Sequence, residues 1–220
     1  MKVVSIVEAR AFRIFRPFGS FGYLPDAAKK VVEEYQFLDY PKEISQFFPT
    51  EPNSPIEFRH GKIVIDSKVI VVDLLQVYPA GLQVVTQTNT SNALAAVDHI
   101  AAWGIRTFDL KLETVRAPGF YSQLHIRFEK PLPDMFPKLN AIASEISNKH
   151  PDVIDFRPQY ELAALHFAYE PKAKIDPVIF RIERVGNVSF SENLYYSDAP
   201  LSTEDHISVL EDFERVNLRD

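Results

Sequence analysis

The chain has 220 residues, of which 46% are hydrophobic, and this composition is typical of a folded globular protein rather than a disordered one. It contains no cysteine, which excludes disulfides, thiolate catalysis and cysteine-ligated zinc or iron–sulfur sites. The formal net charge of −6 disfavours nucleic acid and anionic lipid as partners of the molecule as a whole. No apolar run approaches the ~20 residues that a membrane-spanning helix needs, so we expect no membrane association and a cytoplasmic location.

Charge is distributed unevenly along the chain. Residues 1–30 contain six basic and two acidic side chains, whereas residues 192–220 contain two basic and eight acidic ones. Opposite charge at the two ends favours assembly with a second copy or with another protein, because complementary charged surfaces speed encounter. The alternative is two solvated surfaces without a partner.

The first 55 residues predict a strand, a helix and a proline-rich loop. Residues 3–15 are rich in β-branched and aromatic side chains, which favour a strand. Pro25 and Asp26 suit the first turn of a helix. Four prolines between residues 41 and 55 predict a loop or short helical turns. The sequence therefore suggests an N-terminal appendage over residues 1–55 and a main domain over 56–220, or one continuous domain.

The centre of the chain predicts antiparallel strands followed by a helix. Gly61 suggests a turn between two short strands, and Pro79-Ala80-Gly81 suggests a hairpin connection between two longer ones. The four expected strands are 56–58, 63–65, 69–78 and 82–88. Helix-capping residues follow at 90–92, an apolar residue then recurs every third position, and Gly104 is expected to end the helix.

The C-terminal half predicts five more strands and two helices. The expected strands are 107–115, 120–128, 162–169, 178–185 and 189–195. Asp134 is expected to cap a helix that ends at His150-Pro151, and Ser202 or Thr203 a final helix. The first of these helices is expected to bury one face, formed by Leu139, Ile142, Ala143 and Ile146.

The order of these elements indicates an α+β fold. Residues 82–169 read strand, helix, strand, strand, helix, strand, which is the order of the ferredoxin-like, or split β-α-β, unit. We therefore expect a mostly antiparallel sheet with two to four helices and a ferredoxin-like centre widened by extra strands. This fold serves many functions and indicates none by itself.

An acidic residue two positions before a lysine is typical of strands in metal-dependent nucleases, where the carboxylate holds the ion. Asp109 and Lys111 fall on one side of an expected strand, and Asp73 lies on a strand expected to be its neighbour. Asp73, Asp109 and Lys111 are therefore the candidate catalytic residues. The alternative is an ion pair on the exposed face of the sheet.

Thr88, Asn89, Thr90 and Ser91 form a polar, uncharged run before the central helix. A helix N-terminus can bind an anion through free backbone N–H groups, so these residues are candidates for binding a small anionic ligand. Ordinary helix capping explains the same residues without a ligand.

Basic and aromatic residues alternate near the N-terminus. The candidate interaction residues there are Arg13, Phe15, Arg16, Phe18 and Phe21. Such a pattern suits single-stranded nucleic acid, with rings stacked on bases, or docking on another protein. The same residues fit an edge strand with one buried face.

No residue spacing indicates a metal site or a cofactor, so none is expected. None of the six histidines is spaced from another as metal ligands on one helix would be, and no serine-nucleophile or phosphate-loop motif occurs. The function favoured by the sequence is non-enzymatic: an interaction or assembly protein, either a homo-oligomer or an accessory subunit of a larger complex. The alternatives are a metal-dependent nuclease or phosphodiesterase and a single-stranded nucleic-acid binder.

Overall fold

A computed structural model describes residues 1–18, 24–47, 54–150, 158–168 and 179–218. The chain forms two compact units. The larger unit contains Ile6–Ser122 and Pro200–Thr203, and the smaller unit contains Met1–Ser5, Gln123–Ala199 and Glu204–Asp220. The division at residue 55 that the sequence suggests is a different partition of the chain and stays a prediction.

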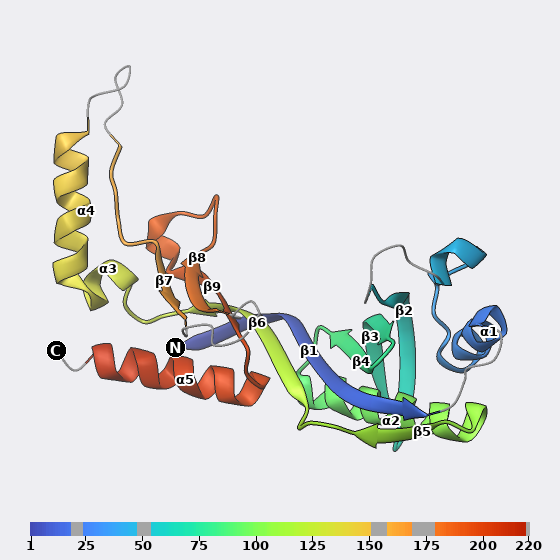
Figure 1. Ribbon diagram of the computed structural model, residues 1–220. Coiled ribbons are helices and arrows are strands. Elements are labelled where there is room, and N and C mark those ends of the chain that lie inside the picture. The colour runs from blue at the N-terminus through green and yellow to red at the C-terminus, as the bar shows by residue number, and fades with distance from the viewer. Residues whose placement is uncertain (19–23, 48–53, 151–157, 169–178, 219–220) are drawn as a thin grey trace. The chain divides into compact units, whose positions relative to one another are not determined.

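The larger unit is built on an antiparallel sheet (Figure 1). Strands β2, β3, β4 and β1 lie in this order, and β5 pairs with the end of β1. The strands are β1 (Lys2–Phe18), β2 (Ile56–Ile65), β3 (Lys68–Tyr78), β4 (Gly81–Thr86) and β5 (Lys111–Thr114). The helices are α1 (Leu24–Tyr35), the 3-10 helix η1 (Ile44–Phe47) and α2 (Thr90–Phe108).

One face of this sheet forms the core with α2. Ala11 of β1 lies opposite Val84 of β4, and Val84 lies opposite Leu75 of β3, so the three side chains share a face. All three are completely buried, as are Ala96 and Val97 of α2 in the same cluster. Small residues on β1 and α2 allow the helix to approach the sheet closely.

The predicted turn at Gly61 is wrong, because β2 continues through it. The neighbouring His60 takes the left-handed conformation, with φ of 57°, and the strand pairing with β3 resumes at Gly61. A Cβ on Gly61 would lie 2.5 Å from the ring of Phe37. Glycine is therefore required here by the close approach of a core ring rather than by a turn.

The smaller unit contains the end of β6, from Gln123, and strands β9, β8 and β7, which lie in this order. They are β6 (Gly119–Arg127), β7 (Ala164–Phe167), β8 (Phe180–Arg184) and β9 (Leu194–Ala199), and β8 is antiparallel to both of its neighbours. The helices are α3 (Leu132–Met135), α4 (Pro137–Lys149), the 3-10 helix η2 (Phe190–Glu192) and α5 (Thr203–Asn217). Leu124, Ile126, Ile182 and Leu210 are completely buried.

Two helix predictions need correction. Gly104 does not end α2, which continues to Phe108 and ends at Asp109 in the left-handed conformation. Gly104 is instead a buried residue inside the helix. In α4, Ala143 is buried as expected, but Leu139, Ile142 and Ile146 are 43–55% exposed. The buried face of α4 is instead formed by Ala143 and Ser147.

The structure confirms an α+β fold with a large antiparallel sheet, and the described residues contain five α-helices. The ferredoxin-like centre is not confirmed, because β4 pairs with β1 and β3. Among the described residues, none of the helices has the length and apolar character needed to cross a membrane.

Candidate functional site

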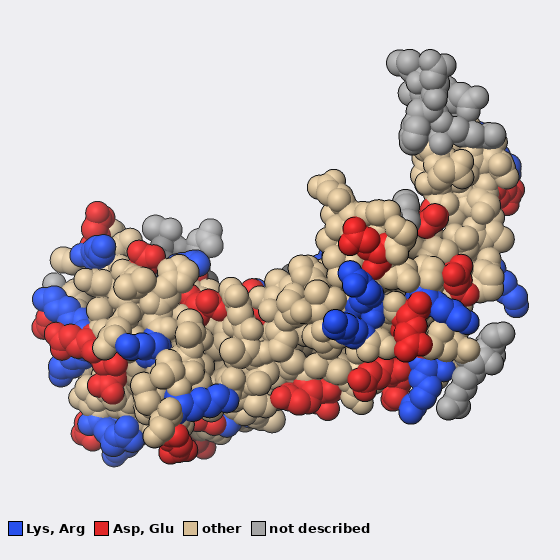
Figure 2. All heavy atoms as spheres, turned by 180° about the vertical axis from the view of Figure 1, so that it is seen from behind, with Lys and Arg blue, Asp and Glu red and all other residues tan. Residues whose placement is uncertain are grey.

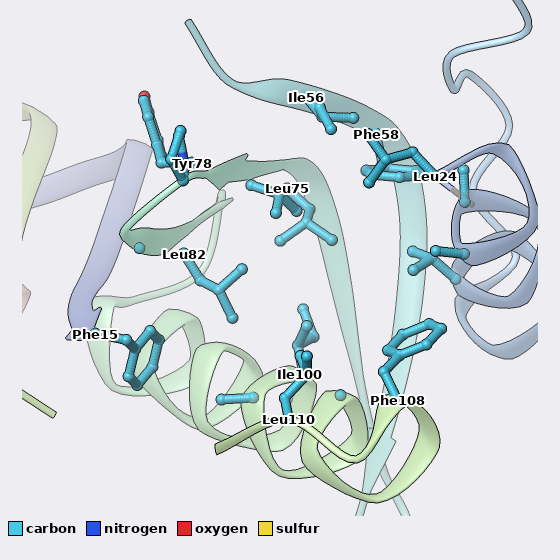
Figure 3. Close-up of a pocket in the computed structure, with 18 of the residues that line it drawn as sticks. Phe15, Leu24, Ile56, Phe58, Leu75, Tyr78, Leu82, Ile100, Phe108 and Leu110 are labelled. Carbon is cyan, nitrogen blue, oxygen red and sulfur yellow. The ribbon is translucent and has the colours of Figure 1, made fainter. Parts of the chain in front are cut away.

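A pocket of about 530 Å³ lies within the larger unit, between the core face of the sheet and α2 (Figure 3). Residues of α1, η1 and β5 complete its wall. The side chains labelled in Figure 3 are almost all apolar. They are Phe15, Leu24, Ile56, Phe58, Leu75, Tyr78, Leu82, Ile100, Phe108 and Leu110.

The hollow exists because small residues face it from two helices. On α2, Ile100, Gly104 and Phe108 recur every four residues and therefore share one face, with Gly104 offering no side chain at its centre. A Cβ on Gly104 would meet nothing closer than Leu110 at 3.9 Å. Ala27 and Ala28 of α1 line the opposite part of the wall. Longer side chains at these positions would fill the space.

The β3–β4 hairpin shapes one edge of the pocket. Gly81 lies opposite Tyr78, and a Cβ on Gly81 would lie 2.7 Å from the carbonyl oxygen of Arg13 on β1. Glycine thus allows the hairpin to approach β1 closely. The backbone N–H of Phe15 donates to the carbonyl of Ala80 at 2.8 Å, which holds the Phe15 ring at the pocket.

None of the side chains that line the pocket within the described residues is charged. Ser54 and Tyr78 are the lining residues there with hydroxyl groups, and Trp103 carries an indole N–H. The hydroxyl of Tyr78 donates to Oε1 of Gln76 at 3.2 Å, and in Figure 3 its side chain points away from Leu75 and Leu82. What the described lining residues offer a ligand is therefore mainly apolar surface.

The structure does not place Asp73, Asp109 and Lys111 on neighbouring strands. Asp109 is the C-cap of α2, and Lys111 begins β5, which pairs with β1. Asp73 lies on β3, which pairs with β2 and β4. Burial raises the pKa of the Asp73 carboxyl, an effect that His60 opposes and Glu8 reinforces. Lys111 is exposed, while Leu110 and Leu112 line the pocket. Both the catalytic role and the alternative of an ion pair on the exposed face stay predictions.

The polar run Thr88–Ser91 forms the start of α2. Asn89 is the N-cap, and its side chain accepts from the backbone N–H of Asn92 at 2.7 Å. Thr90 and Thr203 exchange hydrogen bonds, because the backbone N–H of each donates to the hydroxyl of the other at 2.8–3.0 Å. Helix capping and this reciprocal pair engage the groups that were expected to complete an anion site. Anion binding stays a prediction.

Among the N-terminal interaction residues, Arg13 and Phe15 lie on one face of β1 and Arg16 lies on the other. Arg13 forms an ion pair with Asp98 of α2, and Phe15 is buried at the pocket. Arg16 is exposed, and its guanidinium lies 4.0 Å from Glu113. The backbone of Phe18 pairs with Lys111, and Phe21 lies outside the described residues.

Figure 2 shows one face of the molecule with acidic and basic side chains interspersed over its described residues. A protein that binds the phosphate backbone of nucleic acid needs a broad basic surface. The face shown in Figure 2 has no broad basic surface over the described residues.

Sequence reasoning missed a buried polar group in the smaller unit. His206 is completely buried, and its Nε2 lies 2.9 Å from Oγ of Ser197, which donates to the carbonyl of Arg181 at 2.7 Å. Nε2–H is therefore the donor to Ser197. Burial lowers the pKa of His206 to about 4, and Asp198 opposes this shift. Because the hydroxyl proton of Ser197 is held by a backbone carbonyl, this pair is structural rather than an activated nucleophile.

The described residues contain no group of three or more histidine or acidic side chains placed to hold a metal ion. Comparisons of this chain with protein-family models, curated proteins and solved structures give no match, so the pocket is interpreted by its chemistry alone.

Proposed function

We propose that this protein is a non-enzymatic binding protein whose larger unit holds a neutral, hydrocarbon-rich small molecule in the pocket. The observation that carries the proposal is a pocket of about 530 Å³ lined by apolar side chains from both helices and the sheet. This volume lies within the range of roughly 300–1,000 Å³ that is typical of small-molecule sites.

The lining decides the chemical class of the ligand. A charged group placed in this pocket would lose its hydration without meeting a side chain of opposite charge among the lining residues. Hydrocarbon is favoured instead, because burial gains about 25 cal/mol per Å² of apolar surface removed from water. Rings such as Phe15, Phe58 and Phe108 add large apolar contact areas. An uncharged alkyl or aromatic molecule fits these conditions best.

The test uses N-phenyl-1-naphthylamine, a neutral fluorescent hydrocarbon-like probe. Trp103 is the single tryptophan of the chain and lines the pocket, so bound probe should quench its emission by energy transfer. Ala101→Phe places a ring in the pocket and should weaken probe binding by about tenfold or more. Ala102→Phe is the matched control, since Ala102 is the exposed neighbour on α2 and its substitution should leave binding unchanged.

Failure of the wild-type protein to bind the probe would overturn the proposal. Equal binding by Ala101→Phe and the wild type, with native far-ultraviolet circular dichroism in both, would place the probe elsewhere and overturn it equally.

The functions expected from the sequence remain proposals. Self-association or service as an accessory subunit is compatible with a binding pocket, and so is a cytoplasmic location. The nuclease alternative is weakened because Asp73 and Lys111 lie on strands that do not pair with each other. The nucleic-acid alternative is weakened because Arg13 is paired with Asp98 and Phe15 is buried.

A further inference from the structure

Helix α4 carries an apolar stripe that the described residues leave uncovered. Leu139, Ile142 and Ile146 are 43%, 55% and 46% exposed. Large apolar side chains that adjoin one another on a surface mark an interaction site more often than single exposed ones do. The stripe lies in the smaller unit and is separate from the pocket.

The side of α4 next to the stripe is already packed. Ser147 is buried, its hydroxyl donates to the carbonyl of Ala143 at 3.0 Å, and it accepts from the backbone N–H of Tyr160 at 2.8 Å. The rings of His150 and Tyr160 lie 5.6 Å apart. The extended chain that leads to β7 therefore covers this side of α4, as Figure 1 shows.

The spacing of the stripe is that of a helix–helix seam. Leu139, Ile142 and Ile146 are three and four residues apart, which corresponds to positions a, d and a of a heptad. Such a seam is narrower than the stripe with which a helix packs on a sheet. A second helix is the partner that matches it.

Charge identifies that second helix as another α4. Lys138 and Glu145 occupy the two g positions beside the seam and are both exposed. Within its own helix, Glu145 also forms an exposed ion pair with Lys149 at 2.5 Å, which is weak enough to be shared with a second copy. In an antiparallel pair, Lys138 of each copy comes beside Glu145 of the other, so that two symmetric ion pairs form. In a parallel pair, the g positions would instead face Ala143 and His150, which gives no such complementarity.

We propose that α4 is a self-association surface, on which two copies of this chain pack their α4 helices antiparallel through Leu139, Ile142 and Ile146. Three side chains per copy make a small contact, well below the ~1,600 Å² that typical stable interfaces bury. The dimer formed through this surface is therefore weak and depends on protein concentration. It requires no ligand in the pocket.

Sedimentation equilibrium over roughly a hundredfold range of concentration tests the proposal. The wild-type mass should rise from 25.1 kDa toward twice that value as concentration increases. Ile142→Glu should keep the mass at 25.1 kDa throughout. Val216→Glu alters an apolar residue of α5 that is 65% exposed, and this control should associate as the wild type does.

A charge exchange tests the antiparallel arrangement. Lys138→Glu places two acidic residues together at each end of the seam and should weaken association by about fivefold, whereas Lys138→Glu combined with Glu145→Lys should restore it. A wild type that stays at the monomer mass, or an Ile142→Glu variant that still dimerises, overturns the proposal. Dimers insensitive to the charge exchange overturn the antiparallel contact. Probe binding in the pocket of Ile142→Glu should be unchanged, which separates this result from the proposed function.

Discussion

At the scale of single residues, the core of the larger unit contains one buried polar atom that has no hydrogen-bond partner among the described residues. Tyr35 is 2% exposed, its ring packs edge-on against Phe37 and Trp103, and its hydroxyl finds no hydrogen-bond partner there. Burial is also the main reason that the pKa of Tyr35 is raised, because the charged phenolate would be desolvated. The ring of Tyr35 thus stabilises the folded protein, whereas its unpaired hydroxyl destabilises it.

Tyr35→Phe should therefore raise the free energy of unfolding by about 1 kcal/mol, since it keeps the ring contacts and removes a buried unpaired hydroxyl. Urea denaturation followed by Trp103 fluorescence measures the change. Tyr160→Phe, at a residue that is 41% exposed, should have little effect and serves as the control. Destabilisation by Tyr35→Phe would show that the hydroxyl is bonded in solution.

His206 predicts how stability depends on pH. Its pKa in the folded protein is about 4, below the usual 6.5, so the unfolded chain binds a proton more readily than the folded one. The contribution of neutral His206 to the free energy of unfolding is complete above pH 6.5. It is lost as the pH falls toward 4, by about 3 kcal/mol in total. Urea denaturation at pH 7.5, 6 and 5 should show the decline. His206→Gln should be less stable at pH 7.5 and should lose this part of the pH dependence.

At the scale of elements, the end of α2 depends on a residue that sequence reasoning assigned to chemistry. Asp109 has φ of 51° and ψ of 39°, the left-handed conformation with which many helices end. Aspartate tolerates this conformation better than most residues, and glycine tolerates it best. The position of Asp109 is therefore explained by the backbone.

Asp109→Ala should lower the free energy of unfolding by about 1 kcal/mol, because alanine adopts the left-handed conformation poorly. Asp109→Gly should keep the stability of the wild type. Thermal unfolding followed by circular dichroism compares the two variants. Equal stability of both would mean that the helix ends differently in solution. A nuclease assay of Asp109→Gly would, in the same preparation, test the catalytic alternative without the folding defect.

Local signals in the sequence predicted most elements, and long-range contacts decided the rest. The β3–β4 hairpin and the start of α1 follow from nearby glycine and proline residues, and both were predicted. The predicted end of α2 was wrong because the helix continues through Gly104, near which Leu110 packs. The exposure of Ile142 could not be read from periodicity, since an apolar stripe looks the same whether or not its partner belongs to the same chain.

The pocket was not predicted for a related reason. It depends on Ala27, Ala28, Ala101 and Gly104, which are small residues that meet only after α1 and α2 have packed on the sheet. Each of them is unremarkable on its own helix. A cavity is defined by the side chains that surround it, and their proximity is set by strand pairing between residues far apart in sequence. The wall of the pocket is thus a property of the folded unit.

At the scale of the whole molecule, several elements belong to both units. In β1, Met1–Ser5 is assigned to the smaller unit and the remainder to the larger one, and β6 likewise divides after Ser122. The first residue of α5, Thr203, belongs to the larger unit, where it exchanges hydrogen bonds with Thr90. The chain therefore passes from one unit to the other within β1, within β6 and at the start of α5.

We accordingly expect one cooperative transition for the whole chain. Trp103 fluorescence reports the larger unit, and far-ultraviolet circular dichroism reports both, so their urea midpoints should coincide. A saturating neutral probe in the pocket should raise both midpoints together, by about 2.7 kcal/mol of unfolding free energy at one hundred times its dissociation constant. Ala101→Phe should abolish that increase while Ala102→Phe preserves it. Separate midpoints, with only the fluorescence transition moved by the probe, would show instead that the units unfold independently and that ligand binding stabilises the larger one alone.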